Sequence, residues 1–213
     1  SNTGTLINMN DSSWQTGRTG SGNSLYFDDG NKYVSVSDNA SLDISEAITV
    51  SAWIKADSIA GNHRRIVEKD YRSSWYFGTG DNNSTSLSVW MNNAPHLNTG
   101  NVFNLNEWTH VAFTYDRQTV KIYVNGQVKA SAVYTEAIGL DDQDVWIASW
   151  KGNYANWLGS IDDVGIWNEA LTAEQMGNLY DYGVNVNIPE PRTFSLFAIL
   201  TLLVYSKLKL RRS

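Results

Sequence analysis

The 213-residue chain contains no cysteine and has a formal net charge of −6, which excludes disulfides, zinc–thiolate sites and thiol chemistry. The charge is divided unevenly: residues 1–188 carry 11 Lys and Arg against 21 Asp and Glu, a net charge of −10, and residues 189–213 carry 5 against 1, a net charge of +4. An acidic body with scattered basic residues lacks the positive surface that phosphate backbones require, so we expect no nucleic-acid partner.

Short runs with an apolar residue at every second position alternate with clusters of Gly, Asn, Asp and Ser, which predicts the half-buried strands of an all-β sandwich. The clearest run is "AITVSAWIKA" at residues 47–56, and the same alternation recurs at residues 87–91 and 108–115. The pair Asn125-Gly126 lies between two further alternating runs. This pair predicts a two-residue hairpin with a type I′ turn.

One short helix is expected near the end of the domain, in "ALTAEQMGNLY". Thr172 is the predicted N-cap, and Gln175, three residues later, completes a capping box. Leu171 and Met176 are placed to pack together as a hydrophobic staple. The fold class expected from these patterns is an all-β, two-sheet antiparallel sandwich with one short helix.

Six stretches, in order along residues 4–180, carry a resemblance to a known family. They are "NSLYFDDGNKYVSV", "ITVSAWIKAD", "IVEKD", "NEWTHVAFTYD", "KIYVNGQ" and "LGSIDDVGIWNEALTAEQM". The set resembles the laminin G-like, concanavalin A-like lectin-type jelly-roll domains common in bacterial surface proteins. The resemblance implies a jelly-roll domain over residues 1–184 in which the family's usual first strand, before "GTL", is missing.

The C-terminal segment differs in character from the acidic body. A linker over residues 185–192 contains a Pro-Glu-Pro triplet, and residues 193–213 combine an apolar run with a basic end. The 18 residues from Thr193 to Leu210 would extend about 27 Å as a helix, close to the thickness of a hydrocarbon core. We therefore expect a C-terminal transmembrane helix with its basic end in the cytoplasm, which places the sandwich on the other side of the membrane.

The same segment resembles the bacterial PEP-CTERM sorting signal, which the membrane protease-transferase exosortase processes. The residues that carry this resemblance are Pro189, Glu190, Pro191, Arg211 and Arg212. It implies exosortase and the membrane as partners, and a bacterial protein that is secreted or held at the cell surface or extracellular matrix after a transient inner-membrane anchor. The alternatives are an ordinary single-pass anchor and a C-terminal helix packed on the domain.

Two acidic stretches are candidates for a calcium site. The candidate ligands are Asp28, Asp29 and Asn31 from a turn, and Asp162 and Asp163 from a strand near the end of the domain. Calcium takes about six to eight oxygen ligands, commonly carboxylates and turn carbonyls, and the resembled family often binds it at a rim between such elements. The alternative is that Asp28 and Asp29 cap a turn, while Asp162 or Asp163 accepts hydrogen bonds from backbone amides.

Four aromatic residues lie near stretches rich in Gly and Asn and are candidates for a sugar-binding platform: Trp75, Tyr76, Trp150 and Tyr154. Sugars are typically held by aromatic faces with polar groups beside them. The alternative is that these side chains plug the ends of the sandwich. Trp157, just before "GSIDDV", is expected to be a core residue.

The sequence shows no catalytic constellation. A glycoside hydrolase needs two carboxylates about 5 to 10 Å apart, and "EKD" at Glu68–Asp70 is only a fragment of such a pattern. His110 is expected to be a packed or hydrogen-bonded strand residue. The leading hypothesis is a non-enzymatic cell-surface or extracellular module that binds a glycan or matrix polymer. The alternatives are a structural adhesion or matrix protein that binds no sugar, and a glycoside hydrolase or lyase.

Overall fold

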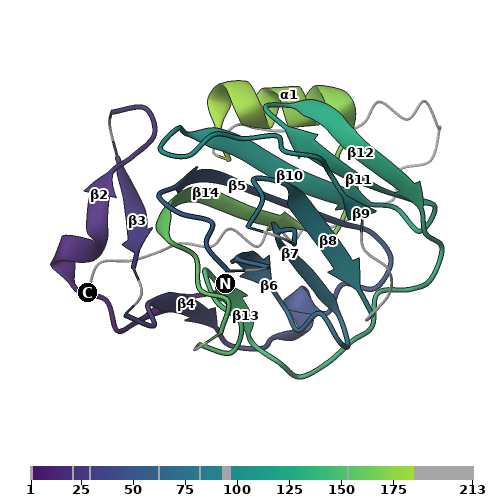
Figure 1. The fold of residues 1–213 in the computed structure, drawn as a ribbon. Helices are drawn as coiled ribbons and strands as arrows, with labels where there is room; N and C mark the ends of the chain where they lie inside the picture. The colour runs from purple at the N-terminus through teal and green to yellow at the C-terminus, as the bar shows by residue number, and fades with distance from the viewer. Residues whose placement is uncertain are drawn as a thin grey trace.

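The part of the chain that the computed structural model describes comprises residues 2–20, 22–28, 30–61, 63–81, 83–92, 97–152 and 154–184. In that part the chain forms two seven-stranded sheets and one α-helix (Figure 1). The predicted two-sheet antiparallel sandwich with one short helix is confirmed. The predicted linker and transmembrane segment, residues 185–213, lie outside the described residues, and no helix within the described residues has the length and apolarity needed to cross a bilayer.

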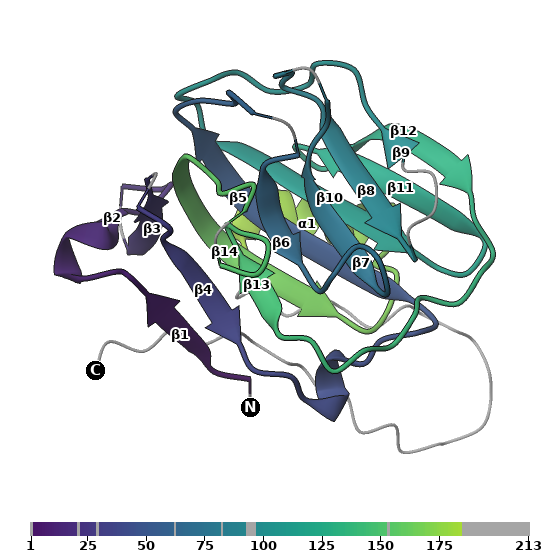
Figure 2. The same cartoon turned by 60° about the horizontal axis from the view of Figure 1, so that its bottom comes forward.

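The sheet that we name sheet A runs in space from an N-terminal edge strand to a short strand near residue 98. Its strands, in spatial order, are β1 (Gly4–Ile7), β4 (Tyr33–Val36), β13 (Val145–Ile147), β6 (Arg65–Glu68), β7 (Trp75–Thr79), β8 (Leu87–Met91) and β9 (Leu97–Asn98). Neighbouring strands are antiparallel throughout. Figure 2 looks onto this sheet, with β1 and β4 at its edge.

The second sheet, sheet B, is also antiparallel. Its strands, in spatial order, are β12 (Gln127–Val133), β11 (Thr119–Val124), β10 (Thr109–Tyr115), β5 (Ile48–Ala56), β14 (Gly159–Trp167), β3 (Asn23–Phe27) and β2 (Trp14–Thr16). Two 3₁₀ turns, η1 (Asp11–Ser13) and η2 (Ala40–Leu42), complete the regular elements before β5. Asn125 and Gly126, between β11 and β12, have φ values of 49° and 74°, so the predicted type I′ hairpin is confirmed.

The core lies between the sheets and follows the period-2 pattern of the sequence. On β5, Ile48, Val50 and Ile54 have no exposed surface, and β10 adds Val111 and Phe113 from the neighbouring strand. Burying one such side chain contributes about 1.5–3 kcal/mol relative to leaving it in water. Trp157 is also fully buried in this core, as its place in the sequence predicts.

The helix α1 (Ala173–Tyr182) covers the outer face of sheet B (Figure 1). Thr172 and Gln175 form the predicted capping box in both directions. A second apolar cluster joins the helix to the sheet, and its buried members are Ala112, Tyr123, Leu171, Met176 and Leu179. Because α1 occupies the outer side of sheet B, the outer side of sheet A is the broad sheet face that the helix leaves uncovered.

Candidate functional site

The outer face of sheet A is built by side chains that alternate with the core. On β7, Trp75 and Phe77 point into the core, so Tyr76 between them points outward. On β8, Val89 and Met91 are core residues, which places Trp90 on the same outer face. Tyr76 pairs directly with Trp90 across the two strands, so the alternation sets two aromatic rings side by side.

A β-bulge on β6 brings a basic and an acidic residue onto this same face. Arg65 pairs with Gly78 and Val67 pairs with Phe77, which leaves Ile66 as an extra residue. Residues three apart in a regular strand point to opposite faces. The extra residue lets Ile66 and Val67 both enter the core and places Arg65 and Glu68 together on the outer face.

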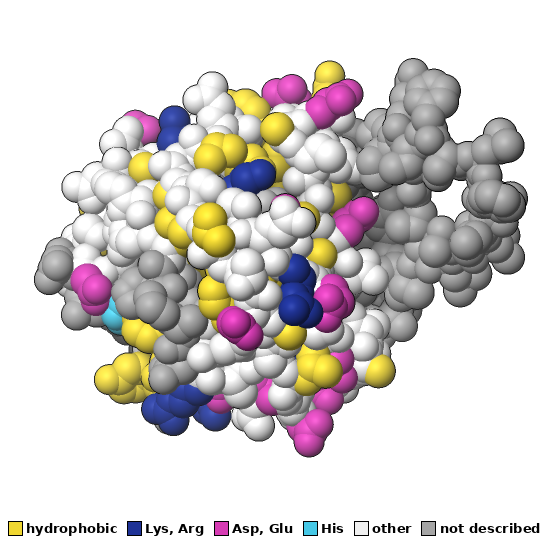
Figure 3. Space-filling view, turned by 90° about the vertical axis from the view of Figure 1, so that its right-hand side faces the viewer, with side chains coloured by type: hydrophobic (Ala, Val, Ile, Leu, Met, Phe, Trp, Pro, Cys, Tyr) yellow, Lys and Arg dark blue, Asp and Glu magenta, His cyan; other side chains and the backbone are white. Residues whose placement is uncertain are grey.

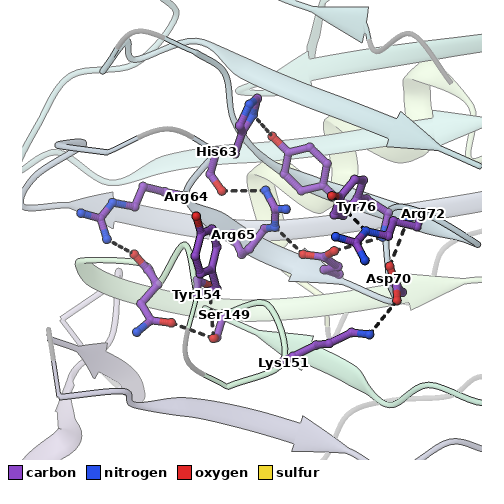
Figure 4. Close-up of polar contacts among 12 residues, drawn as sticks. His63, Arg64, Arg65, Asp70, Arg72, Tyr76, Ser149, Lys151 and Tyr154 are labelled. Atoms are coloured by element: carbon purple, nitrogen blue, oxygen red, sulfur yellow. Dashed lines mark hydrogen bonds and ion pairs between the residues drawn. The ribbon is translucent and has the colours of Figure 1, made fainter. Parts of the chain in front are cut away.

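Arg65, which Figure 4 shows next to Tyr76, forms a buried ion pair with Glu68. The Glu68 side chain is fully buried and accepts a further hydrogen bond from the Tyr71 amide at 3.0 Å. The Arg65 guanidinium donates to the His63 carbonyl at 2.8 Å and lies 4.1 Å from the centre of the Tyr76 ring. Burial raises the pKa of Glu68 to about 7, although the neighbouring Arg65 charge acts in the opposite direction.

Arg65, Tyr76 and Trp90 line a pocket of about 650 Å³ on this face, within the range of about 300–1,000 Å³ that is usual for small-molecule sites. Its lining consists of Gly61, His63, Arg64, Arg65, Tyr71, Tyr76, Trp90, Trp150, Tyr154 and Ala155. The Tyr71 ring is central, with its centre 5.5 Å from Trp90 and 5.3 Å from Trp150. Tyr154 stands edge-on to Trp150 at 5.6 Å and is 65% exposed.

The loops around the pocket hold backbone conformations that non-glycine residues rarely adopt. His63, Asp70, Lys151 and Ala155 have φ values of 55°, 57°, 52° and 52°. Such left-handed positions cost about 1–3 kcal/mol each and cluster where a protein holds a binding or catalytic site. Here they turn the loops sharply, and the Trp150 amide bonds the Tyr154 carbonyl at 2.8 Å.

The four aromatic residues predicted from the sequence divide between the pocket and the core. Tyr76, Trp150 and Tyr154 meet in the pocket. Trp75 does not join them, because its side chain is 1% exposed and packs 6.0 Å from Phe113 between the sheets. Trp75 is therefore a core residue between the sheets and not a member of the predicted platform.

Sequence reasoning missed other lining residues, namely His63, Arg64, Arg65, Tyr71 and Trp90. Trp90 carried a usable signal, since it lies between two residues predicted to face the core and must therefore face outward. Tyr71 and His63 lie in loops, where no period indicates a direction.

The predicted calcium ligand Asp28 is engaged within the protein. Its carboxylate accepts from the Lys32 ammonium group at 2.8 Å and from the Gly30 amide at 2.9 Å. These hydrogen bonds, that of Lys32 foremost, lower the pKa of Asp28. The interpretation that Asp28 caps its turn is confirmed. Asn31 bonds the Asn156 side chain at 3.1 Å.

The acids of β14 lie at the other end of the β3–β14 pair. Gly159 pairs with Phe27 in antiparallel register, so Asp28 lies beyond one end of this pairing and Asp162 lies toward the other. At about 3.3 Å per residue, the two acids are at least about 10 Å apart along the strands. Asp162 accepts from the Arg18 amide at 3.2 Å, and Asp163 pairs with the Arg18 side chain at 3.3 Å. Burial raises the pKa of Asp162.

No three acidic or histidine side chains converge on a metal site within the described residues, and Asp29 lies outside them. Calcium binding at the predicted residues therefore stays a prediction, and the described contacts give Asp28, Asp162 and Asp163 partners inside the protein.

Solved structures share this fold at low sequence identity. Domain 4 of AbnA, a GH43 extracellular arabinanase from Geobacillus stearothermophilus, solved with arabinotriose, matches with a TM-score of 0.63 at 20% identity over 83% of this chain and 81% of that one. The binding domain of Paraclostridial Mosquitocidal Protein 1 matches with a TM-score of 0.63 at 16% identity, over 78% of this chain and 44% of that one. The ligand-binding domain of botulinum neurotoxin serotype D, solved with N-acetylneuraminic acid, matches with a TM-score of 0.57 at 20% identity. This match covers 70% of the present chain and 40% of the neurotoxin chain.

These likenesses establish the fold, and this chain spans less than half of the two toxin chains. No curated protein sequence matches the chain. The family model described as the concanavalin A-like lectin/glucanases superfamily matches residues 28–177. That match covers more than half of the 213 residues, and it agrees with the two-sheet sandwich. The chain therefore belongs to the concanavalin A-like lectin/glucanases superfamily.

Proposed function

We propose that this domain is a non-enzymatic, extracellular glycan-binding module and that the pocket on the outer face of sheet A is its binding site. The observation that carries the proposal is the aromatic lining of that pocket, with Tyr71, Trp150 and Tyr154 grouped beside the polar side chains of His63 and Arg65. Sugar rings present C–H groups that pack on aromatic faces and hydroxyl groups that hydrogen-bond to polar side chains. The pocket offers both kinds of contact within one opening.

The acids near the pocket are placed to support structure rather than hydrolysis. Glu68 is fully buried and held by Arg65 and the Tyr71 amide. Asp81 pairs with His63 at 2.8 Å, and Asp70 pairs with Lys151 at 3.0 Å. A glycosidase needs one carboxylate to protonate the leaving oxygen and a second to attack or to activate water, and these acids are instead committed to basic partners. This supports binding without turnover.

Similar structures support the same proposal from outside the chain. The arabinanase domain was solved with arabinotriose and the neurotoxin domain with N-acetylneuraminic acid. We extend this sugar-binding property to the present chain as a proposal, because its own pocket carries the aromatic groups that such ligands use.

Removing an exposed pocket ring tests the proposal. The wild-type domain is screened on a glycan array that includes arabino-oligosaccharides and sialylated oligosaccharides, and the best ligand is titrated by calorimetry. Tyr154→Ala should weaken binding about tenfold through loss of one aromatic contact. Tyr182→Ala is the matched control, since Tyr182 is 67% exposed against 65% for Tyr154 but lies at the end of α1.

Two results would contradict the proposal. Absence of glycan binding together with capture of matrix proteins would favour the structural adhesion alternative. Release of reducing sugar from any array polysaccharide would favour a hydrolase.

We also propose that residues 189–213 are an exosortase sorting signal that anchors the domain transiently in the inner membrane. The support is the ordered combination of Pro189-Glu190-Pro191, an uncharged run of 13 residues from Thr193 to Tyr205, and Arg211-Arg212. Mass spectrometry of the mature protein from its host should find a C-terminus near the triplet. Surface protein that still ends at Ser213 would contradict sorting and leave a permanent anchor.

A further inference from the structure

Basic side chains gather at the pocket of an otherwise acidic domain. Four of the 11 Lys and Arg among residues 1–188 lie in or beside it, namely Arg64, Arg65, Arg72 and Lys151. The same residues 1–188 have a net charge of −10. Figure 3 shows one side of the molecule, on which acidic and basic side chains are interspersed. The local concentration of positive charge therefore needs an explanation at the pocket itself.

Part of this charge is neutralised by neighbouring carboxylates. Arg65 pairs with the buried Glu68, and Lys151 pairs with Asp70 at 3.0 Å while its side chain remains 42% exposed. Arg64 donates to the carbonyl oxygens of Ala60 and Asn156, which orient the guanidinium but carry no net charge.

Arg72 differs from these residues because it is exposed and forms no ion pair within the described part of the chain. Its Nε donates to the Tyr71 hydroxyl at 3.2 Å. The centre of its guanidinium lies 5.0 Å from the Trp150 ring and 5.5 Å from the Tyr71 ring. Two lining residues of the pocket therefore hold this charge at its edge.

The orientation of Arg72 suits recognition of a carboxylate. A guanidinium binds a carboxylate with two parallel N–H···O bonds, and stacking on aromatic rings fixes its plane without using the terminal nitrogens. Because Nε is engaged with Tyr71, the Nη1 and Nη2 pair remains for such a contact. The Lys151 ammonium group lies 5.9 Å from the same Trp150 ring, but it is paired with Asp70 at 3.0 Å, so the carboxylate contact is assigned to Arg72 alone.

We propose that the pocket selects sugars that bear a carboxylate, with the sugar ring against Trp150 and Tyr154 and the carboxylate on Arg72. This inference rests on the proposed glycan-binding function and narrows it to one chemical class. An aromatic wall binds neutral and acidic sugars alike, so the selectivity comes from the exposed guanidinium. A uronic acid and a sialic acid both supply the required group.

Matched pairs of probes separate charge from sugar shape. Polygalacturonate is compared with its methyl ester, which has the same backbone without the negative charge, and 3′-sialyllactose is compared with lactose. The wild-type domain should bind at least one acidic member about tenfold or more tightly than its neutral partner, and the preference should shrink as salt rises from about 0.05 to 0.5 M. The pair that shows the preference identifies the uronate or the sialate as the source of the carboxylate.

Arg72→Gln should abolish the preference for the acidic member of the pair. The variant should bind the acidic probe only as tightly as the neutral probe. Lys129→Gln, on the exposed β12 strand of the other sheet, removes the same charge far from the pocket and should leave the preference intact. Circular dichroism melts check that both variants are folded. Equal loss in both variants would overturn the proposal by showing non-specific attraction.

Failure of the selectivity and failure of the binding function give different results. Neutral glycans that bind as tightly as acidic ones, and that lose affinity in Tyr154→Ala, would overturn carboxylate selection and leave the binding module in place. Absence of binding to every probe would overturn both. A preference for acidic probes that persists in Arg72→Gln would also overturn the assignment to Arg72.

Discussion

His110 is a buried histidine that the fold keeps neutral. Its side chain is 1% exposed and lies beside Trp53, at 5.4 Å, and Tyr180, at 6.2 Å, two rings that also stack on each other at 5.6 Å. Its Nδ1 has no hydrogen-bond partner within the described residues. Burial, with a smaller contribution from the Arg18 charge, lowers the pKa of His110 to about 4. This residue is the packed strand histidine that the sequence predicts.

The neutral state of His110 predicts a loss of stability in acid. The unfolded chain takes up this proton near pH 6.5 and the folded domain only near pH 4, so protons favour the unfolded chain between these values. Above pH 6.5 this histidine does not reduce the free energy of unfolding. As the pH falls to about 4, the free energy of unfolding decreases by up to about 3 kcal/mol. His110→Phe, which keeps a ring at this position, should remove this loss in urea unfolding at pH 7 and pH 4.5.

The comparison between wild type and His110→Phe isolates the histidine. Glu68 has a raised pKa of about 7. Its contribution to the free energy of unfolding is therefore fully present below pH 4.5 and is lost as the pH rises to 7. This pH dependence is opposite in sign to that of His110. Both proteins contain Glu68, and its effect cancels in their difference. A variant with the same acid loss as wild type would show that His110 is protonated inside the fold.

The buried pair of Arg65 and Glu68 predicts a large effect of removing one partner. Glu68→Ala leaves the Arg65 charge buried without its counter-ion, which should cost about 3–5 kcal/mol in denaturant unfolding. Asp81→Ala is the control, because its carboxylate is 48% exposed in its pair with His63 and should cost less than about 1 kcal/mol. A Glu68→Ala cost as small as the control would mean that Arg65 reaches water.

At the scale of elements, the capping box at the N-terminus of α1 is expected to make a small contribution to the stability of the domain. Thr172 accepts from the Gln175 amide at 3.2 Å, and the Gln175 side chain accepts in return from the Thr172 amide at 2.8 Å. Thr172→Ala removes the side-chain acceptor and should lower the free energy of unfolding by about 1 kcal/mol. Thr135→Ala, at an exposed position outside any helix or strand, should change it by less than about 0.5 kcal/mol. Equal effects would show that the box does not stabilise the domain.

Elements with a clear period could be predicted from the sequence, and the pocket between them could not. The alternation in β5 and β10, the turn at Asn125-Gly126 and the cap at Thr172 are local signals, and each is present in the structure. The bulge at Ile66 cannot be predicted from the residues around it, because it depends on the register between β6 and β7. Without that register, Arg65 and Glu68 would be assigned to opposite faces.

The aromatic residues show the same limit on a smaller scale. Trp75 and Tyr76 are adjacent and of similar character, so composition alone places both in one group. Only the neighbouring core residue Phe77 determines that Trp75 points inward and Tyr76 outward. The left-handed turns at His63 and Lys151, which bring their loops to the pocket, carry no distinctive residue type that a single sequence would reveal.

At the scale of the whole molecule, the closed core predicts that residues 1–184 fold without the C-terminal segment. The two sheets bury their shared faces, and α1 covers the outer apolar cluster that includes Met176 and Leu179. A chain ending at residue 184 should therefore melt cooperatively, with a midpoint within about 3 °C of the full-length protein in detergent. A truncated chain that gives no cooperative transition would contradict this and assign a structural role to the tail.

The pocket and the C-terminal exit lie on opposite sheets, which determines how the domain carries a mechanical load. The pocket opens on the outer face of β6 and β7, whereas Val184 packs against the apolar cluster outside sheet B. In the proposed module, tension between a bound polymer and an anchored chain beyond Val184 would enter through one sheet and leave through the other. The force crosses the stacked apolar layers instead of running along a single hydrogen-bonded ladder. Resistance to pulling is therefore set by the cohesion of the core, and substitutions at Val50 or Phe113 should weaken the attachment without touching the ligand.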